Sequence, residues 1–272
     1  MAKTTFASTL AALAALALCA APAQAQQTAA AATPPPPART SVPPAVNLSM
    51  LFDVKFRGMT AGEFDLTFTV QDGRYQAAAA RRTTGLARSI LGNRQDYTYS
   101  SNGEVVNGAL KPAAYQHRGG RRDRTVRVAF GDAIVTTSDP PGMGMGNPPA
   151  TEAQKRGAID QLTALASMLV ASGSPCRGTI PVYMDGRSRF DFVMRPNGRV
   201  DYRGAAWRGQ AVRCTVQFRP IAGFSDPQEA ATLTFLFAPL PNGVFAPLQI
   251  EMPSDDGIFQ LEAKRFRSGG PA

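Results

Sequence analysis

The side chains that could carry enzyme chemistry are few and scattered along the chain. His117 is the single histidine, and no Gly-x-Ser-x-Gly turn exists to accompany it, so the sequence does not support a serine hydrolase triad. The segment around it, Tyr115 to Arg118, has the pattern of a β-strand, and we interpret His117 as an exposed or hydrogen-bonded strand residue. Asp255-Asp256-Gly257 is typical of a turn. We therefore assign no catalytic residue, although a carboxylate pair of the glycosidase kind is defined in space and stays open.

The cysteines predict a disulfide rather than a metal site. Cys19 lies in an apolar leader, which leaves Cys176 and Cys214 in the body of the chain. Two cysteines in an exported protein more often form a disulfide than a metal pair, and zinc would need further Cys or His ligands. Two separate buried thiols are the alternative. Met143 and Met145 have no third soft ligand nearby, so we expect a flexible loop there and no metal or cofactor.

One dense group of arginines could bind an anion. Its members surround Asp123 and are Arg118, Arg121, Arg122, Arg124 and Arg127, in a chain with formal net charge +9. Phosphorylated lipid headgroups and acidic envelope glycans are plausible partners for such a patch, because positive surfaces concentrate anions. The alternative is a solvated strand face. Nucleic acid is not expected as a partner of an exported protein.

The N-terminus has the features of a secretory signal peptide. A basic n-region at Lys3 precedes an apolar run from Leu10 to Ala21, and Ala23-Gln24-Ala25 is a small-x-small cleavage site. We predict a signal peptide over residues 1–25, cleavage after Ala25 and a periplasmic location. Lipidation of Cys19 is the alternative, but Leu18 stands where a lipobox needs a small residue. The apolar run is too short for a membrane helix, and we expect no transmembrane segment in the mature protein.

Composition divides the rest of the chain. Residues 26–46 are rich in Ala, Gln, Thr and Pro and predict a semi-extended linker. Residues 47–267 are expected to form a single β-rich domain, with one half over 47–138, a central loop and helix over 139–172 and a second half over 173–267. Residues 268–272 form a tail.

Strand and turn signals dominate the predicted domain. Residues 63–71 alternate strictly and place Phe64, Leu66, Phe68 and Val70 on one face of a half-buried strand. Asx-Gly and Gly-Asp pairs, which favour tight hairpins, recur through the chain. They are Asp72-Gly73, Asn102-Gly103, Gly131-Asp132, Asp185-Gly186, Asn197-Gly198, Asn242-Gly243 and Asp256-Gly257. So many hairpins indicate an antiparallel meander or barrel.

One segment has a helical pattern. Thr151 and Gln154 form a capping-box signature, and the apolar residues that follow at helical spacing are Ile159, Leu162, Ala166 and Leu169. Ser172-Gly173 is a normal helix stop. The spacing predicts one helix of about 20 residues, which ends near Gly173 and whose apolar face packs on the sheet.

The motifs together resemble a known family. They are Gly58-Met-Thr-Ala-Gly62, Ser101-Asn-Gly103 through Leu110-Lys-Pro112 to Tyr115, Gly157-Ala-Ile-Asp160, Cys176, Tyr183-Met-Asp-Gly-Arg187, Phe190-Asp191, Cys214-x-Val-x-Phe218, Pro220-Ile-Ala-Gly-Phe224 and Pro247-Leu-Gln-Ile-Glu251. In order and spacing they resemble the exported family called domain of unknown function 3108. The layout is also similar to that of disulfide-bearing β-spiral envelope-integrity proteins, which implies two half-barrels around a helix. The family supplies no catalytic residue to carry over.

These observations lead to one interpretation and two alternatives. We expect a mostly β fold: curled antiparallel half-barrels, or a β-spiral, around one central helix. The expected function is non-enzymatic, namely envelope maintenance through binding of an apolar or amphiphilic ligand, or of a partner protein, in a concave β face. A hydrolase acting on envelope glycan or lipid is one alternative, and a scaffold without a small ligand is the other.

Overall fold

The computed structural model describes residues 43, 45–91, 96–120, 122–254 and 256–269. The predicted signal peptide, Cys19, most of the predicted linker and Arg121 lie outside the described residues. Among those described, no helix is both long enough and apolar enough to cross a membrane.

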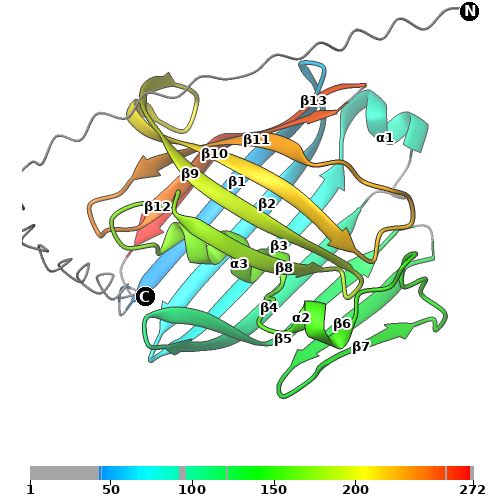
Figure 1. The fold of residues 1–272 in the computed structure, drawn as a ribbon. Helices are drawn as coiled ribbons and strands as arrows, with labels where there is room; N and C mark the ends of the chain where they lie inside the picture. The colour runs from blue at the N-terminus through cyan, green and yellow to red at the C-terminus, as the bar shows by residue number, and fades with distance from the viewer. Residues whose placement is uncertain (1–42, 44, 92–95, 121, 255, 270–272) are drawn as a thin grey trace, which may run out of the picture. The chain divides into compact units, whose positions relative to one another are not determined.

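In the described part of the chain, thirteen strands form one antiparallel sheet, and three short helices accompany it (Figure 1). The first seven strands are β1 Val46–Phe56, β2 Met59–Gln71, β3 Arg74–Thr83, β4 Tyr97–Val106, β5 Ala109–Gly119, β6 Arg124–Phe130 and β7 Ile134–Asp139. The last six are β8 Gly178–Met184, β9 Ser188–Arg203, β10 Arg208–Ala222, β11 Ala231–Pro239, β12 Phe245–Ser254 and β13 Gly257–Gly269. The helices are α1 Gly85–Leu91, α2 Glu152–Lys155 and α3 Gln161–Leu169.

The two halves of the predicted domain are two meanders joined edge to edge. Within the first meander, β1–β7, and within the second, β8–β13, each strand pairs with its neighbour in sequence, and the ladder between β1 and β13 joins the two meanders. The mostly β prediction is confirmed, but the two half-barrels are wrong: the sheet is neither closed nor strongly curled. Its edges are β7 and β8, which share no ladder. Near these edges, Thr136 Oγ1 of β7 donates to the backbone carbonyl of Gly186, in the turn after β8, at 3.2 Å.

Strict alternation builds the core as expected. In β2 the side chains of Leu66, Phe68 and Val70 are buried and that of Phe64 is partly buried, which confirms the predicted strand face. Opposite them on β1, Leu48 pairs with Phe68 and Phe52 pairs with Phe64. Burying each such apolar side chain contributes about 1.5–3 kcal/mol, so the shared face of β1 and β2 is a main source of stability.

Five of the seven predicted turn pairs lie at hairpins. Asp72-Gly73, Gly131-Asp132, Asp185-Gly186, Asn242-Gly243 and Asp256-Gly257 lie where one strand meets the next. Asn102-Gly103 and Asn197-Gly198 were wrong as hairpins, since they lie inside β4 and β9 where the register shifts. The bulge in β4 requires glycine because the neighbouring strand passes very close. A Cβ on Gly103 would lie 1.9 Å from the carbonyl oxygen of Lys111.

The predicted single helix is two helices with an extended break. The capping box at Thr151 is confirmed and begins α2, which ends at Lys155. Gly157 then takes φ +73°, and Ile159 is extended: its N–H donates to the Pro181 carbonyl at 2.9 Å. Asp160 caps a new helix, α3. The predicted length of about 20 residues was therefore wrong, because periodicity alone does not reveal that Ile159 pairs with β8.

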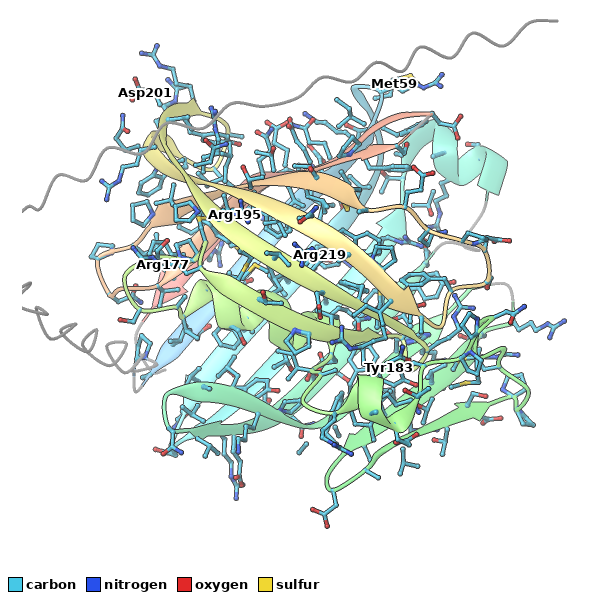
Figure 2. The ribbon with its side chains drawn as sticks, in the orientation of Figure 1. Met59, Arg177, Tyr183, Arg195, Asp201 and Arg219 are labelled. Atoms are coloured by element: carbon cyan, nitrogen blue, oxygen red, sulfur yellow. A yellow bond between two sulfur atoms is a disulfide. The ribbon has the colours of Figure 1, made fainter. Side chains whose placement is uncertain are left out.

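α3 is nevertheless central to the core. It packs against strands β3, β4, β5, β8 and β12, and therefore against both meanders (Figure 1). Leu162, Ala166 and Leu169 are buried as predicted, whereas Ile159 is only partly buried. Side chains fill the space around the helix; Tyr183 of β8, labelled in Figure 2, is fully buried, and its hydroxyl donates to Gly186 at 2.6 Å.

Candidate functional site

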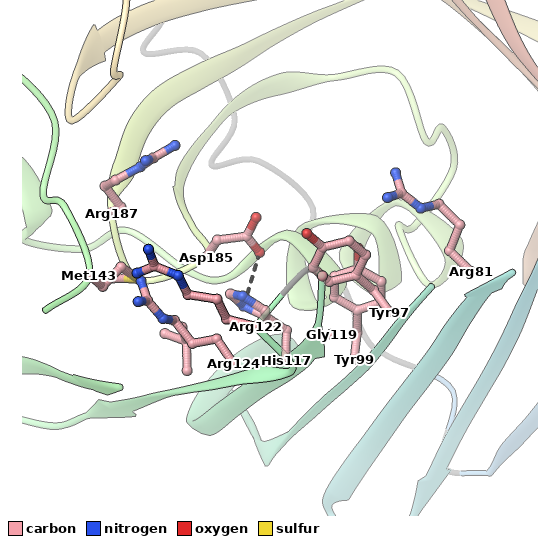
Figure 3. A pocket seen from close by; sticks show the side chains of 12 residues that line it. Arg81, Tyr97, Tyr99, His117, Gly119, Arg122, Arg124, Met143, Asp185 and Arg187 are labelled. Atoms are coloured by element: carbon pink, nitrogen blue, oxygen red, sulfur yellow. Dashed lines mark ion pairs between the residues drawn. The ribbon is translucent and has the colours of Figure 1, made fainter. Parts of the chain in front are cut away.

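A cavity of about 570 Å³ lies where β3, β4, β5 and β6 face the turn between β8 and β9. Strands from the first meander form its floor, and the Asp185–Arg187 segment from the second meander forms one wall (Figure 3). Its size is within the range of small-molecule sites, about 300–1,000 Å³. The cavity therefore combines residues that are far apart in sequence.

Arginine side chains dominate the cavity. Arg122 comes from the turn before β6, Arg124 from the start of β6, Arg187 from the β8–β9 turn and Arg81 from β3. Alternation along β6 puts Arg124 on the same face as the buried Val126, so its guanidinium points inward.

Three of these guanidinium groups have no acidic partner among the described residues. Within the part of the chain that the structure describes, no ion pair joins Arg122, Arg124 or Arg187 to a carboxylate. Arg187 donates to the hydroxyl of Ser225 at 3.0 Å, and the buried Nε of Arg124 has no hydrogen-bond partner among the residues described. Buried donors are normally satisfied, so this wall of the cavity is suited to an anion that accepts hydrogen bonds.

Asp185 is the one acid among the described lining residues. It has φ +53° in the tight turn with Gly186, and the turn holds its carboxylate against the strand floor. Its Oδ1 accepts hydrogen bonds from Tyr115 Oη at 2.8 Å and Gln161 Nε2 at 2.6 Å, and lies 3.3 Å from Nδ1 of His117. One oxygen atom of Asp185 thus connects the β8–β9 turn to β5 and α3.

His117 is part of this site, although its sequence context indicated only an ordinary strand residue. Its side chain is 10 % exposed, and burial lowers its pKa below the usual 6.5 while the Asp185 carboxylate opposes that shift. The imidazole is therefore neutral at neutral pH. Because Nδ1 faces Oδ1 of Asp185, the proton of the neutral ring belongs on Nδ1. The pair has the geometry of a base and its orienting acid.

Two tyrosines form the opposite side of the cavity. Tyr97 and Tyr99 alternate on β4, so both rings project from one face and stack with their centroids 6.0 Å apart. The guanidinium of Arg81 lies over the ring of Tyr97, 5.0 Å from its centroid. Burial raises the pKa of Tyr99, so its hydroxyl stays protonated and available as a donor.

A buried polar network supports the floor from below. Asp160 caps α3 by accepting from the backbone N–H of Thr163 at 2.9 Å, and its Oδ2 accepts from the hydroxyls of Ser101 and Thr163. The Tyr75 hydroxyl lies 2.6 Å from that of Thr163. Burial raises the pKa of Asp160 despite these bonds. The network fixes the start of α3 on β3 and β4 and so sets the position of the next residue, Gln161, at the cavity.

The proline- and glycine-rich segment after β7 contributes one side chain. Met143 lines the cavity, while Met145 is not among the lining residues. The end of this segment is anchored, since the N–H of Asn147 donates to the Phe224 carbonyl at 2.9 Å and Gly146 lies directly against Gly223. No group of three or more potential metal ligands from His, Cys, Asp and Glu occurs within the described residues.

The structure separates the members of the predicted arginine patch. Arg122 and Arg124 line the cavity. Arg118 lies on the outer face of β5 and pairs with Asp123, with Nε 3.0 Å from Oδ1, and Arg127 is exposed on the outer face of β6. Arg121 lies outside the described residues. The sequence reasoning missed Arg81, Arg187, Asp185 and the two tyrosines, although the Tyr-x-Tyr and Tyr-x-His spacings marked two strand faces that carry polar aromatic groups.

The disulfide prediction is confirmed. Cys176 and Cys214 are bonded, with their Cα atoms 5.1 Å apart, and both are fully buried. The bond joins the segment before β8 to β10 and so ties the edge of the second meander to its interior. It lies in the core rather than at the cavity.

A comparison with known protein families found one family that matches most of the chain. The family described as protein of unknown function (DUF3108) matches residues 51–264, which include almost all of the sheet and the whole cavity. The chain belongs to the DUF3108 family. The resemblance expected from the motifs is therefore confirmed. The DUF3108 description names no activity, so the roles of the cavity residues follow from their geometry alone. No curated protein matches the chain.

Proposed function

We propose that this DUF3108 protein binds the phosphate-bearing part of a cell-envelope molecule in the cavity and does not transform it. The observation that carries the proposal is the convergence of Arg122, Arg124 and Arg187 on one cavity without a carboxylate partner within the described residues. Guanidinium groups bind phosphate through paired, charge-assisted hydrogen bonds. A phosphate group would supply the acceptors that the buried Nε of Arg124 lacks.

The proposed compartment rests on the N-terminal sequence. Residues 1–25 have the pattern of a cleaved signal peptide, and a buried disulfide is typical of an oxidising compartment such as the periplasm. N-terminal sequencing of protein purified from the native periplasm should find Gln26 first. An intact Met1 or a lipid on Cys19 would contradict the proposal.

The binding test compares two arginines on opposite faces of β6. Arg124→Ala removes a cavity guanidinium, whereas the matched control Arg127→Ala removes an exposed one from the outer face of the same strand. Calorimetric titration with ethyl phosphate should show binding at least about tenfold weaker for Arg124→Ala, because a charge-assisted hydrogen bond contributes about 1.5–3 kcal/mol. Arg127→Ala should change affinity by less than about threefold.

A salt series and vesicle cosedimentation test whether the binding is electrostatic and whether the ligand is lipid-borne. Binding should weaken between about 0.1 M and about 1 M salt, as the screening length falls from about 10 Å to about 3 Å. Cosedimentation with anionic and neutral vesicles, with soluble phosphorylated glycan as competitor, separates lipid-borne from soluble ligands. Equal losses for Arg124→Ala and Arg127→Ala would mean general surface attraction. Absence of binding at low salt would favour a partner protein or a scaffold role instead.

The His117–Asp185 pair favours a second candidate, a hydrolase acting on an envelope phosphoester. A neutral histidine oriented by a carboxylate beside an anion site has the arrangement that general base catalysis requires. Incubation with phosphorylated envelope glycan and lipid, read as released phosphate, distinguishes the two candidates. Phosphate release that is lost in His117→Gln while ethyl phosphate binding is retained would replace the binding function with hydrolysis.

A further inference from the structure

The two carboxylate oxygens of Asp185 have different surroundings. Its Oδ1 is held by Tyr115, Gln161 and His117, but no hydrogen bond joins Oδ2 to any other described residue. The side chain is 42 % exposed, and Figure 3 shows this second oxygen directed away from His117. Oδ1 therefore holds the turn against β5 and α3, and Oδ2 is accessible to a ligand.

This oxygen does not serve the arginines as a counter-charge. No ion pair joins Asp185 to Arg122, Arg124 or Arg187, even though all of them line the same cavity. A carboxylate beside a phosphate site also weakens the binding of a plain phosphate, since like charges repel. A site for inorganic phosphate or a simple phosphate ester alone would be better without it.

The turn does not require an aspartate either. At φ +53°, Asn and Asp are the non-glycine residues that fit best, and the carbonyl oxygen of Asn would accept the same hydrogen bonds from Tyr115 and Gln161. The difference between Asn and Asp at this position is the open oxygen and its charge. Asp185 is thus suited to accept a hydrogen bond from a ligand that has a donor group as well as an anionic group.

We propose that the ligand is a phosphorylated sugar, with its phosphate on the arginine wall and a sugar hydroxyl donating to Oδ2 of Asp185. The inference rests on the proposed binding function and narrows it to one chemical class. A sugar phosphate provides acceptors for the guanidinium groups and donors for the carboxylate in one molecule. The cavity, about 570 Å³, is within the size range of sites for such ligands.

The test compares two phosphate monoesters that differ in their donors. Wild-type protein is titrated with glucose 6-phosphate and with ethyl phosphate, and the ratio of their dissociation constants is measured. The sugar phosphate should bind at least about tenfold more tightly than ethyl phosphate, because hydrogen bonds to a charged acceptor are stronger than those between neutral groups. In Asp185→Asn the donors Tyr115 and Gln161 hold the amide oxygen, so the NH₂ group faces the cavity. The ratio should then fall several-fold, while ethyl phosphate binds as tightly or more tightly.

The outcomes separate this inference from the broader proposal. A wild-type ratio near one, or a ratio that Asp185→Asn leaves unchanged, overturns the sugar assignment while ethyl phosphate binding still stands. Failure of both esters to bind overturns the binding function itself. Thermal melting checks that Asp185→Asn folds. If the variant does not fold, the wild-type ratio of dissociation constants still tests the sugar assignment. Vesicles carrying a phosphorylated glucosamine lipid, competed by free glucose 6-phosphate, show whether the sugar is lipid-borne or soluble.

Discussion

The hydroxyl of Ser101 on β4 donates to Oδ2 of Asp160 across 2.8 Å, although the two residues are 59 positions apart in sequence. Through this bond and its contacts with Thr163, Asp160 serves as helix cap and as anchor between α3 and the first meander. The candidate site depends on that anchor, because Gln161 follows directly and holds Asp185.

Asp160→Ala should therefore destabilise the fold. The change removes a helix cap, which costs about 0.5–2 kcal/mol, and leaves buried donors without partners, at about 1–3 kcal/mol. We expect a loss of about 2–4 kcal/mol in the free energy of unfolding, measured by urea denaturation. Ser101→Ala, which leaves the cap intact, should cost less. A change below about 0.5 kcal/mol in Asp160→Ala would mean that the network does not anchor the helix.

Leu162→Ala should cost about 2–5 kcal/mol, as for other large-to-small changes in a packed interior. Leu162 is 4 % exposed and lies on the face of α3 that packs on the sheet. Ile159→Ala is the matched control and should cost less, because Ile159 is only partly buried and its backbone bonds to β8 do not depend on the side chain. Equal, small losses in both variants would place α3 outside the core.

Cys214→Ser should lower the melting temperature. The bond closes a loop with a sequence separation of 38, for which the chain-entropy model gives about 4 kcal/mol. At about 2–4 °C per kcal/mol for a protein of this size, we expect a decrease of roughly 8–16 °C in thermal denaturation. Protein that begins at Gln26 should also show no maleimide-reactive thiol when it is denatured without reductant. Two reactive thiols would exclude the bond.

Stability should depend on pH through His117. Its folded-state pKa lies below 6.5, so the unfolded chain takes up the proton first as the pH falls. The contribution of the neutral ring is complete above about pH 6.5 and is lost progressively as the pH falls from there toward the folded pKa. Urea denaturation of wild type and His117→Gln between about pH 7.5 and about pH 5.5 should give a smaller decrease for the variant. Parallel curves would assign the pH dependence to other groups.

Much of the local structure could be predicted from the residues alone. Alternation identified the buried face of β2, five of the seven predicted turn pairs located hairpins, and the capping box at Thr151 located the start of α2. The cysteine count predicted the bond between Cys176 and Cys214. These features depend on neighbours within a few positions, or on a choice among very few partners, so the sequence contains the physical information that decides them.

What the sequence could not determine depends on contacts between distant segments. The β1–β13 ladder, which makes one sheet from two meanders, has no local signal, because any edge strand offers the same backbone groups. The break at Ile159 arises because β8 supplies backbone partners that a continuing helix would forgo. The candidate site is of the same kind: Tyr115 and Asp185 are 70 positions apart, and only the packing of the β8–β9 turn against β5 and β6 brings His117, Asp185 and the arginines around one cavity.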